Sequence, residues 1–505
     1  MSAWGSGFEG RRIADLGDGT YRNPILAGDH PDPSVLKDGE DYYLTWSSFD
    51  AAPGLQILHS RDLVNWTPIG FALERPIAVT FAVDIAKHDG RYFIYIPFIP
   101  APWAEGFGTT SRIFAISAPS MAGPWSEPVD LGIEGYIDPG HVVGEDGKRY
   151  LFLSRGSRVR LTDDGLATDG PIEQVYEGWR YPDDWITESY ALEGPKLLRH
   201  DGWFYLVSAV GGTAGPPTGH MVTVSRSRSV HGPWEHDPGN PIARTGSADE
   251  PWWSRGHATV VEGPAGDWWM VSHAYEHGYR TLGRQVLLEP VEWTEDGWLR
   301  APTSDLSAPL RKPIDVPGQQ HGGPLSDDFR GPGLGSQWAF HAPAPGELDR
   351  VRFEGGLVLA GKGTSPGDAS PLTVIAGDLA YEVSVSVEVE GGAEGGLLLF
   401  FNSALFLGMG IDGARMRTYS GGKPSHWQEP APAVRSLDLR IRNDEHIVTF
   451  FYRQPGGEWV RHAVRFETSG YHANTIGDLL SLRPALFAAG SGSVRFRDFR
   501  YRALR

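Results

Sequence analysis

The sequence predicts an all-β protein in which a five-bladed β-propeller is followed by a β-sandwich. One observation is a glycine-bearing turn followed by an aromatic-rich strand, which recurs five times between residues 38 and 271. The second is a change to strictly alternating strands in the last third of the chain. The composition agrees, because 65 glycines and 39 prolines suit many short strands and turns.

Each copy of the repeat consists of a small turn and a strand of aromatic or β-branched residues. In the first copy, Asp38 and Gly39 precede Tyr42, Tyr43 and Leu44. This order is typical of a β-hairpin, and hairpins repeated at blade length are typical of a propeller. The five turn glycines are Gly39, Gly90, Gly147, Gly202 and Gly266.

A polar side chain stands a few residues before each of the five turns. The strand before such a hairpin is the innermost strand of a blade, so these side chains are expected to converge on the central channel. Carboxylates gathered in one channel are costly unless they act chemically or bind a cation. The five residues are Asp32, Asp84, Asp138, Glu193 and His257. The alternatives are a turn-forming aspartate at position 32 and a structural histidine at position 257.

The length of 505 residues favours more than one core, and the sequence divides into three parts. Residues 1–305 are expected to form the propeller, 306–325 a linker rich in proline, glycine and polar residues, and 326–505 the sandwich. Residues 381–389 alternate apolar and polar side chains, as a half-buried antiparallel strand does. The sandwich shows no carboxylate cluster that resembles a catalytic pair.

The charge and the ends of the chain limit its partners. A net charge of −18 argues against nucleic acid, which needs a basic surface, and against anionic membranes. There is no secretory signal at the start and no apolar run of about 20 residues, so we expect a cytoplasmic protein without a membrane partner. The chain has no cysteine, so no disulfide is predicted. The oligomeric state stays open, and a homo-oligomer is compatible with the sequence.

Several motifs around the axial residues resemble glycoside hydrolase family 43, particularly its β-xylosidase and α-L-arabinofuranosidase members. The resemblance spans nearly the whole chain and implies a five-bladed propeller with a concanavalin-like sandwich. The matching segments run from Asn23 to Val35, Ser47 to Trp66, Ile137 to Leu151, Glu193 to Ser208 and Gly211 to Trp234, with Asp328, Phe329 and Trp338 at the start of the sandwich.

The resemblance implies an inverting mechanism with three carboxylates. Asp32 would be the general base, Glu193 the general acid, and Asp138 the residue that orients the acid and tunes its pKa. Arg284 and His257 would be substrate-pocket or axial groups. No cofactor is required, although some relatives carry a Ca²⁺ ion on the axis, which would place one near His257.

Elementary chemistry fits these roles. Inversion needs a base and an acid about 6.5–9.5 Å apart, so that a water fits between the base and the sugar. A neighbouring Asp138 carboxylate would raise the pKa of Glu193 by like-charge repulsion, whereas Asp32 must stay ionised. Arg284 could hold sugar hydroxyls and help to keep Asp32 charged.

Three further residues are candidates for contact with the sugar. Phe49 and Trp103 could supply apolar platforms, with packing as the alternative. Asp84 is the axial residue of the second blade. It follows Phe81-Ala82-Val83, where relatives often have Trp-Ala-Pro, and this departure leaves the identity of the sugar open.

The predicted function is therefore an exo-acting hydrolase that releases xylose from short β-1,4-xylo-oligosaccharides, with arabinofuranose as a second accepted sugar. The runner-up is a dedicated α-L-arabinofuranosidase. An alternative from another class is a glycan-binding protein, but a lectin needs no proton donor. The expected partner is a small oligosaccharide.

Overall fold

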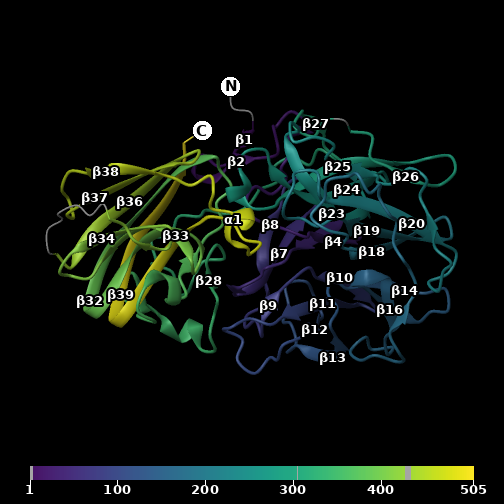
Figure 1. The fold of residues 1–505 in the computed structure, drawn as a ribbon, viewed down its shortest axis with the longest axis horizontal. Helices are drawn as coiled ribbons and strands as arrows, with labels where there is room; N and C mark the ends of the chain where they lie inside the picture. The colour runs from purple at the N-terminus through teal and green to yellow at the C-terminus, as the bar shows by residue number, and fades with distance from the viewer. Residues whose placement is uncertain (1–3, 304, 427–433, 505) are drawn as a thin grey trace.

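Five antiparallel sheets of four consecutive strands each surround a central axis in the first part of the protein (Figure 1). The structure is a computed structural model that describes residues 4–303, 305–426 and 434–504. Two of the sheets carry one additional short strand, β9 or β22. The predicted five-bladed propeller is thereby confirmed.

The blades follow one another along the chain. Blade one contains β4 (Ser34–Asp38), β5 (Asp41–Thr45), β7 (Gly54–Ser60) and β8 (Thr67–Leu73), and blade two β9 (Val79–Thr80), β10 (Asp84–His88), β11 (Arg91–Ile99), β12 (Arg112–Ala118) and β13 (Val129–Glu134). Blade three contains β14 (Gly140–Val143), β15 (Arg149–Leu153), β16 (Ser157–Arg160) and β17 (Glu173–Gln174). Blade four contains β18 (Glu193–His200), β19 (Trp203–Val210), β20 (Met221–Ser227), β21 (Glu235–His236) and β22 (Ala243–Arg244), and blade five β23 (Trp252–Glu262), β24 (Trp268–Glu276), β25 (Gln285–Trp293) and β26 (Leu299–Arg300).

The repeated hairpin places the first long strand of each blade at the axis. Gly39 and Gly90 have φ angles of 64° and 75°, the left-handed region that residues with a Cβ disfavour. The strands β4, β10, β14, β18 and β23 contact one another in this order, and β23 also contacts β4, which closes the ring. The residues just before or within these strands therefore face one channel.

The N-terminal segment and the start of the linker lie along the last blade. The short strands β3 (Thr20–Tyr21) and β27 (Leu310–Arg311) pair with each other. The side chain of Asn23 donates to the carbonyl oxygen of Leu288 over 2.9 Å. Nζ of Lys312 lies 2.7 Å from Oδ2 of Asp15, and the side chain of Lys312 is only 2% exposed. The predicted linker is thus attached to the propeller by hydrogen bonds and an ion pair.

The sandwich is built on two long strands, β32 (Ala380–Asn402) and β39 (Arg483–Ala503), which pair along most of their length. Both belong to one continuous sheet of 13 strands, and glycines lie near the middle of each strand. Gly391 and Gly492, which pair with each other, have φ angles of 67° and 130°, so a side chain at either place would strain the backbone there. In β32, residues 381–389 alternate buried and half-buried side chains, as the sequence predicts.

The remaining strands of the sandwich extend this sheet beside the two halves of the long pair. Beside the first half of β32 and the second half of β39 lie β29 (Val351–Phe353), β30 (Leu357–Ala360), β36 (Ser436–Asp444), β37 (Ile447–Arg453) and β38 (Val460–Glu467). Beside the other two halves lie β28 (Ala339–His341), β31 (Leu372–Thr373), β33 (Leu405–Ile411), β34 (Met416–Ser420) and β35 (Lys423–Pro424). Both groups of strands share one hydrophobic core.

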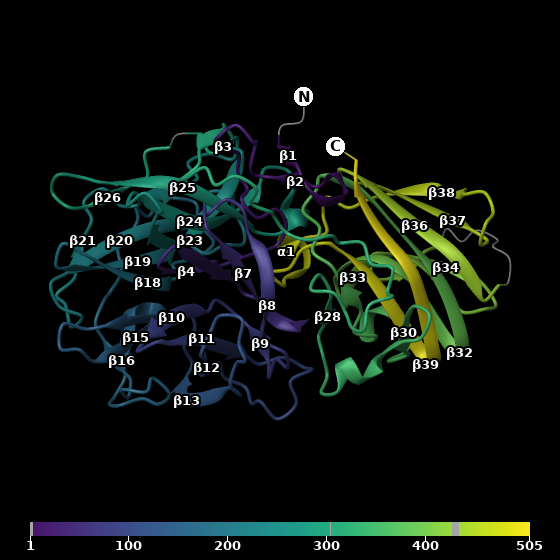
Figure 2. The same cartoon turned by 180° about the vertical axis from the view of Figure 1, so that it is seen from behind.

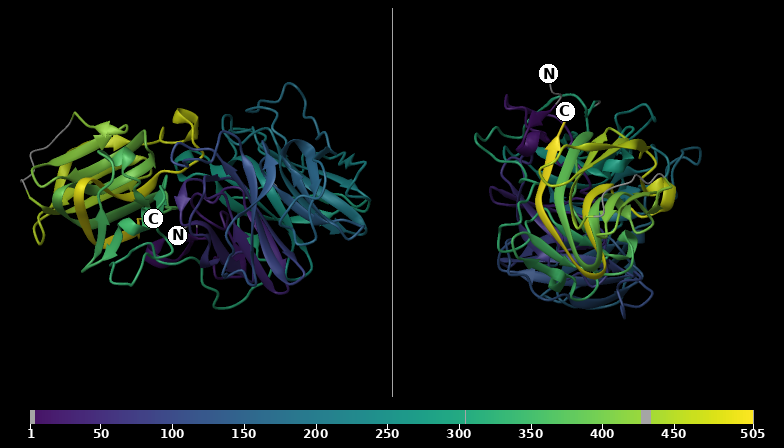
Figure 3. Two further views of the ribbon diagram at one scale, coloured as in Figure 1. Left: turned by 90° about the horizontal axis from the view of Figure 1, so that it is seen from below. Right: turned by 90° about the vertical axis from the view of Figure 1, so that its left-hand side faces the viewer.

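The propeller and the sandwich lie side by side and share backbone hydrogen bonding (Figures 2 and 3). Strand β6 (Ala51–Ala52), which follows β5 of the first blade, pairs with β28 of the sandwich. Phe49 belongs to the hydrophobic core cluster of the sandwich, together with Trp338 and Phe340. The helix α1 (Ala473–Ile476) lies at the junction (Figure 1), where Asn474 donates to Gly215. None of the helices in the described ranges is both long and apolar enough to cross a bilayer.

Candidate active site

Three of the five axial residues have an unusual backbone conformation. Asp32, Asp138 and His257 have φ angles of 57°, 55° and 48°. Such left-handed conformations are uncommon for residues with a side chain and cost about 1–3 kcal/mol each. They persist where the surroundings impose them, and they gather at functional sites. The axial end of the inner strands is therefore the candidate catalytic site.

The carboxylate of Asp32 is held from several sides. Arg284 Nη1 donates to Oδ1 over 2.9 Å, and Ser47 Oγ donates to Oδ2 over 2.5 Å. The Asp32 side chain is 8% exposed. Burial by itself opposes ionisation, but the guanidinium of Arg284 together with His257 and His273 outweighs it, and the pKa of Asp32 lies well below its usual range. Asp32 is therefore ionised at neutral pH, as a general base must be.

Glu193 is the first residue of β18 and lies beside a β-bulge that ends at Lys196. Its side chain is 21% exposed, and Oε1 is 3.3 Å from Nε2 of His220. Burial, followed by the nearby charge of Asp32, raises the pKa of Glu193 to about 8. Glu193 is therefore protonated at neutral pH, so it can donate a proton.

Asp138 lies next to Glu193 and is held by the backbone of Gly194, the residue that follows Glu193. Oδ2 of Asp138 accepts a hydrogen bond from the N–H of Gly194 over 3.0 Å. Burial, followed by the charges of Glu193 and Asp32, raises the pKa of Asp138 well above its usual range. The expected repulsion between Asp138 and Glu193 is thus present. The raised pKa of Glu193 has two further causes, burial as the first and the charge of Asp32.

Arg284 connects the base to the sandwich. Its backbone N–H donates to Oδ1 of Asp29, whose Oδ2 lies 2.7 Å from Nη2 of Arg483 at the start of β39. Nε and Nη2 of Arg284 are buried and have no hydrogen-bond partner among the described residues. A buried donor without a partner is costly, so these nitrogens are suited to bind hydroxyls of a ligand.

Asp84 lies on the axis as expected, but its carboxylate is paired within the protein. Oδ1 is 2.7 Å from Nζ of Lys196, and Oδ2 accepts the backbone N–H of His141 over 2.7 Å. The side chains of Asp84 and Lys196 are 11% and 8% exposed. This arrangement indicates that Asp84 joins the second blade to the third and fourth blades rather than binding the sugar.

Phe49 and Trp103 line one large cavity of about 820 Å³ between the first two blades and the sandwich. The guanidinium carbon of Arg284 lies 5.5 Å from the ring centroid of Phe49, but neither Arg284 nor any of the three carboxylates lines this cavity. Nε1 of Trp103 donates to Asp50 over 2.6 Å, so the indole is fixed. From the sandwich, residues 478–480 form part of the opposite wall.

His257 was a candidate ligand of an axial Ca²⁺ ion. Its Nδ1 is 3.5 Å from Asp32 Oδ1, and its Nε2 is buried without a hydrogen-bond partner in the described part of the chain. No group of three or more His, Asp or Glu side chains among the described residues is arranged to hold a metal ion. Because Ca²⁺ takes six to eight oxygen ligands, one ring nitrogen does not fit it, and no step below uses a metal.

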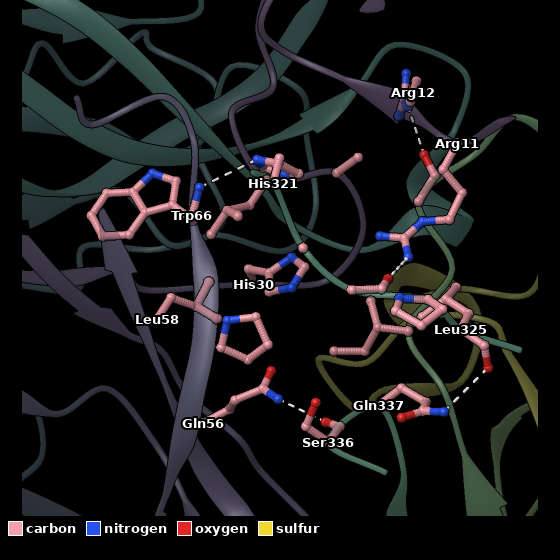
Figure 4. A pocket seen from close by; sticks show the side chains of 18 of the residues that line it. Arg11, Arg12, His30, Gln56, Leu58, Trp66, His321, Leu325, Ser336 and Gln337 are labelled. Carbon is pink, nitrogen blue, oxygen red and sulfur yellow. Dashed lines mark hydrogen bonds between the residues drawn. The ribbon is translucent and has the colours of Figure 1, made fainter. Parts of the chain in front are cut away.

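A second cavity, of about 120 Å³, lies between the first blade, the N-terminal segment and the linker (Figure 4). His30 and His321 project into it, and Nε2 of Gln56 donates to the carbonyl oxygen of Ser336 across one side over 2.7 Å. None of the three catalytic carboxylates lines this cavity. It belongs to the junction of the two domains.

Sequence reasoning did not identify two buried histidines beside the carboxylates. His273 lies in β24, and the backbone N–H of Asp32 donates to its Nδ1 over 2.9 Å. His220 directly precedes β20 and faces Glu193. A signal was present, because a histidine within the largely apolar strand from Trp268 to Tyr275 calls for a polar partner.

Comparison with known proteins gives the family. The model of glycosyl hydrolases family 43 matches residues 21–299. A xylan 1,3-beta-xylosidase of a Vibrio species is 33% identical over 317 residues, or 55% of this chain and 56% of the relative. A non-reducing end alpha-L-arabinofuranosidase of Bacteroides ovatus is 33% identical over 345 residues, or 64% of this chain and 62% of the relative. These alignments thus cover less than two thirds of the relatives' lengths.

Solved structures match over almost the whole chain. The GH43 protein of Bacillus licheniformis has a TM-score of 0.84 at 27% identity, and the match covers 96% of this chain and 100% of that one. The xylan beta-1,4-xylosidase of Bacillus halodurans has a TM-score of 0.83 at 25% identity, covering 95% and 99%. Both matches include the sandwich as well as the propeller. The chain belongs to family 43 of the glycosyl hydrolases.

Proposed function

We propose that the chain is an inverting, exo-acting glycoside hydrolase that releases xylose from short β-1,4-xylo-oligosaccharides. The observation that supports this most is that two carboxyl groups in one channel have opposite protonation states at neutral pH. Arg284 holds the pKa of Asp32 well below its usual range, whereas burial raises that of Glu193 to about 8. A site with one ionised and one protonated carboxyl group is what acid–base hydrolysis of a glycoside needs.

In the reaction, the proton of Glu193 moves to the glycosidic oxygen as the bond from that oxygen to the anomeric carbon breaks. A water forms a new bond to the anomeric carbon from the opposite face and gives a proton to Asp32. Asp138 holds the backbone of Gly194 and thereby the start of the strand that carries Glu193. Arg284 keeps Asp32 ionised, and its free nitrogens bind sugar hydroxyls.

Exo action is supported by the relatives, one of which is a non-reducing end alpha-L-arabinofuranosidase of Bacteroides ovatus. An enzyme that acts at the non-reducing end accepts the end of a chain. Xylose and arabinofuranose present similar hydroxyl groups to a small pocket, so the same site can also release arabinofuranose.

A dedicated α-L-arabinofuranosidase is the second candidate. It is favoured by one specific observation, namely that the Bacteroides ovatus arabinofuranosidase and the Vibrio xylosidase have the same identity to this chain, 33%. A side-by-side assay on nitrophenyl β-xyloside, nitrophenyl α-L-arabinofuranoside and xylobiose decides between the two sugars.

The enzymatic function itself is tested with Glu193→Gln, with Glu235→Gln on the outer strand β21 as the matched control. We expect Glu193→Gln to lower kcat on xylobiose by about 10²–10⁴-fold, the usual contribution of a general acid, and the control to be unaffected. If the wild-type protein binds xylo-oligosaccharides but releases no reducing sugar, it is a glycan-binding protein and the proposal fails.

A further inference from the structure

Two buried histidines form a continuous row of contacts between Asp32 and Glu193. His273 Nδ1 contacts Asp32, and its Nε2 is 3.2 Å from Nδ1 of His220. Nε2 of His220 is in turn 3.3 Å from Oε1 of Glu193. Both imidazole side chains have an exposed fraction of 0%. The row therefore links the base residue to the acid residue without passing through solvent.

The proton position on His273 follows from its first contact. The backbone N–H of Asp32 donates to Nδ1 over 2.9 Å, and a backbone N–H can only donate. Oδ1 of Asp32 is also 3.1 Å from Nδ1, but only the backbone N–H has hydrogen-bond geometry there. Nδ1 must therefore carry a lone pair, so that a neutral His273 has its proton on Nε2. The neutral form is supported by burial, which lowers the pKa of His273 to about 3. Thr213 Oγ1 and His220 Nδ1 both lie 3.2 Å from Nε2 as acceptors.

The same reasoning sets the proton on His220. Its Nδ1 faces the N–H of His273, and two N–H groups cannot face each other at this distance, so Nδ1 is the acceptor. Burial lowers the pKa of His220 to about 4, and the neutral ring then carries its proton on Nε2. This nitrogen is buried and makes no hydrogen bond of good geometry within the described part of the chain. The carboxyl oxygen in front of it is Oε1 of Glu193.

We infer that His273 and His220 form a hydrogen-bonded chain in which each Nε2–H points towards Glu193, so that His220 presents its Nε2–H to Oε1. Glu193 then carries its transferable proton on Oε2. The inference rests on the proposed role of Glu193 as general acid. Both histidines are positioning residues and keep their protons throughout. The proton on Oε2 passes to the glycosidic oxygen, and the N–H of His220 stabilises the carboxylate left behind.

Kinetics with matched variants of His220 test this role. His220→Leu removes the donor, whereas His220→Gln keeps an N–H near the position of Nε2. We expect His220→Leu to lower kcat about 10–100-fold on phenyl glycoside and xylobiose, whose leaving groups need the acid. On the 2,4-dinitrophenyl glycoside, which needs little acid assistance, the loss should stay below about threefold. His220→Gln should recover most of the lost rate.

His236→Gln, in the outer strand β21, is the control for loss of a histidine and should leave both rates unchanged. A structural role for His220 would lower the rates on both classes of leaving group equally, and that result would overturn the inference. So would a rate for His220→Gln on xylobiose as low as that of His220→Leu.

A second measurement does not depend on activity. In the full chain labelled with ¹⁵N-histidine, NMR reports which ring nitrogen carries the proton, and His220→Gln and His273→Asn assign the two rings among the 17 histidines. We expect both rings to carry the proton on Nε2, and a proton on Nδ1 of either ring would contradict the inference. If the wild-type protein proved inactive, the proposed function would fail while this result still decided the direction of the chain.

Discussion

Replacing Arg483 by methionine is expected to destabilise the protein, because the change leaves a buried carboxylate without its ionic partner. Nη2 of Arg483 lies 2.7 Å from Oδ2 of Asp29, and the two side chains are 14% and 1% exposed. Removing one partner of a buried pair costs about 3–5 kcal/mol. We therefore expect Arg483→Met to lower the free energy of unfolding by about that amount. Because Asp29 also holds the backbone N–H of Arg284, kcat should fall as well.

The assay is urea unfolding followed by tryptophan fluorescence, for which the chain offers 18 tryptophans. The matched control is the double variant Asp29→Asn with Arg483→Met. It removes both charges and keeps an oxygen that can accept the N–H of Arg284. Since neutral replacement of a buried pair is often nearly neutral in stability, we expect the double variant to lie within about 1 kcal/mol of the wild type.

Two results would refute this reasoning. The first is a loss of less than about 1 kcal/mol for Arg483→Met, which would mean that the pair contributes as little as a surface ion pair. The second is a double variant as unstable as Arg483→Met alone, which would mean that the cost comes from lost packing of the arginine and not from the unpaired charge of Asp29.

Three further predictions concern the titrating and paired groups. Because Glu193 must be protonated and its pKa is raised to about 8, kcat should fall as the pH rises through about 8. The acid limb, set by Asp32, should lie below the usual range of an aspartate, and a pH–rate profile measures both limbs. Arg284→Met removes the cation that lowers the pKa of Asp32, so the acid limb in the same profile should move to higher pH. Lys196→Met leaves Asp84 buried and unpaired and should lower the free energy of unfolding by about 3–5 kcal/mol in urea titrations, and Lys196→Arg, which keeps a cation there, should lose less.

The architecture could be predicted from the sequence because it depends on local signals. Each blade begins with a hairpin whose glycine turn and aromatic strand are neighbours along the chain, so five copies could be recognised without any knowledge of contacts. The same repeat places Asp32, Asp138 and Glu193 at equivalent positions, and the structure puts all three at the axial ends of the inner strands.

The rest of the site depends on contacts between distant parts of the chain. Asp29 and Arg483 are 454 positions apart, and no local pattern pairs them. Asp84 looks like the other axial carboxylates in the sequence, but Lys196 from the fourth blade neutralises it. His220 lies outside the hairpin repeat, and His273 lies in the last strand of its fifth copy, so their approach to the carboxylates becomes visible only in the folded chain.

The cause of the raised pKa of Glu193 was also not readable from the sequence. Charge repulsion by a neighbouring carboxylate can be guessed from a motif, but burial depends on how closely the blades surround the residue. In the structure, burial is the larger effect, and Asp32 adds a like charge besides the repulsion between Asp138 and Glu193.

The stereochemistry of the first product tests the central claim most directly, since that claim is that Asp32 activates a water on the face opposite to Glu193. Proton NMR of wild-type protein acting on nitrophenyl β-xyloside, recorded before the anomers equilibrate, distinguishes the two outcomes. Inversion predicts that α-xylose appears first and β-xylose later. β-Xylose as the first product would mean retention through a covalent intermediate and would contradict the roles given to both carboxyl groups.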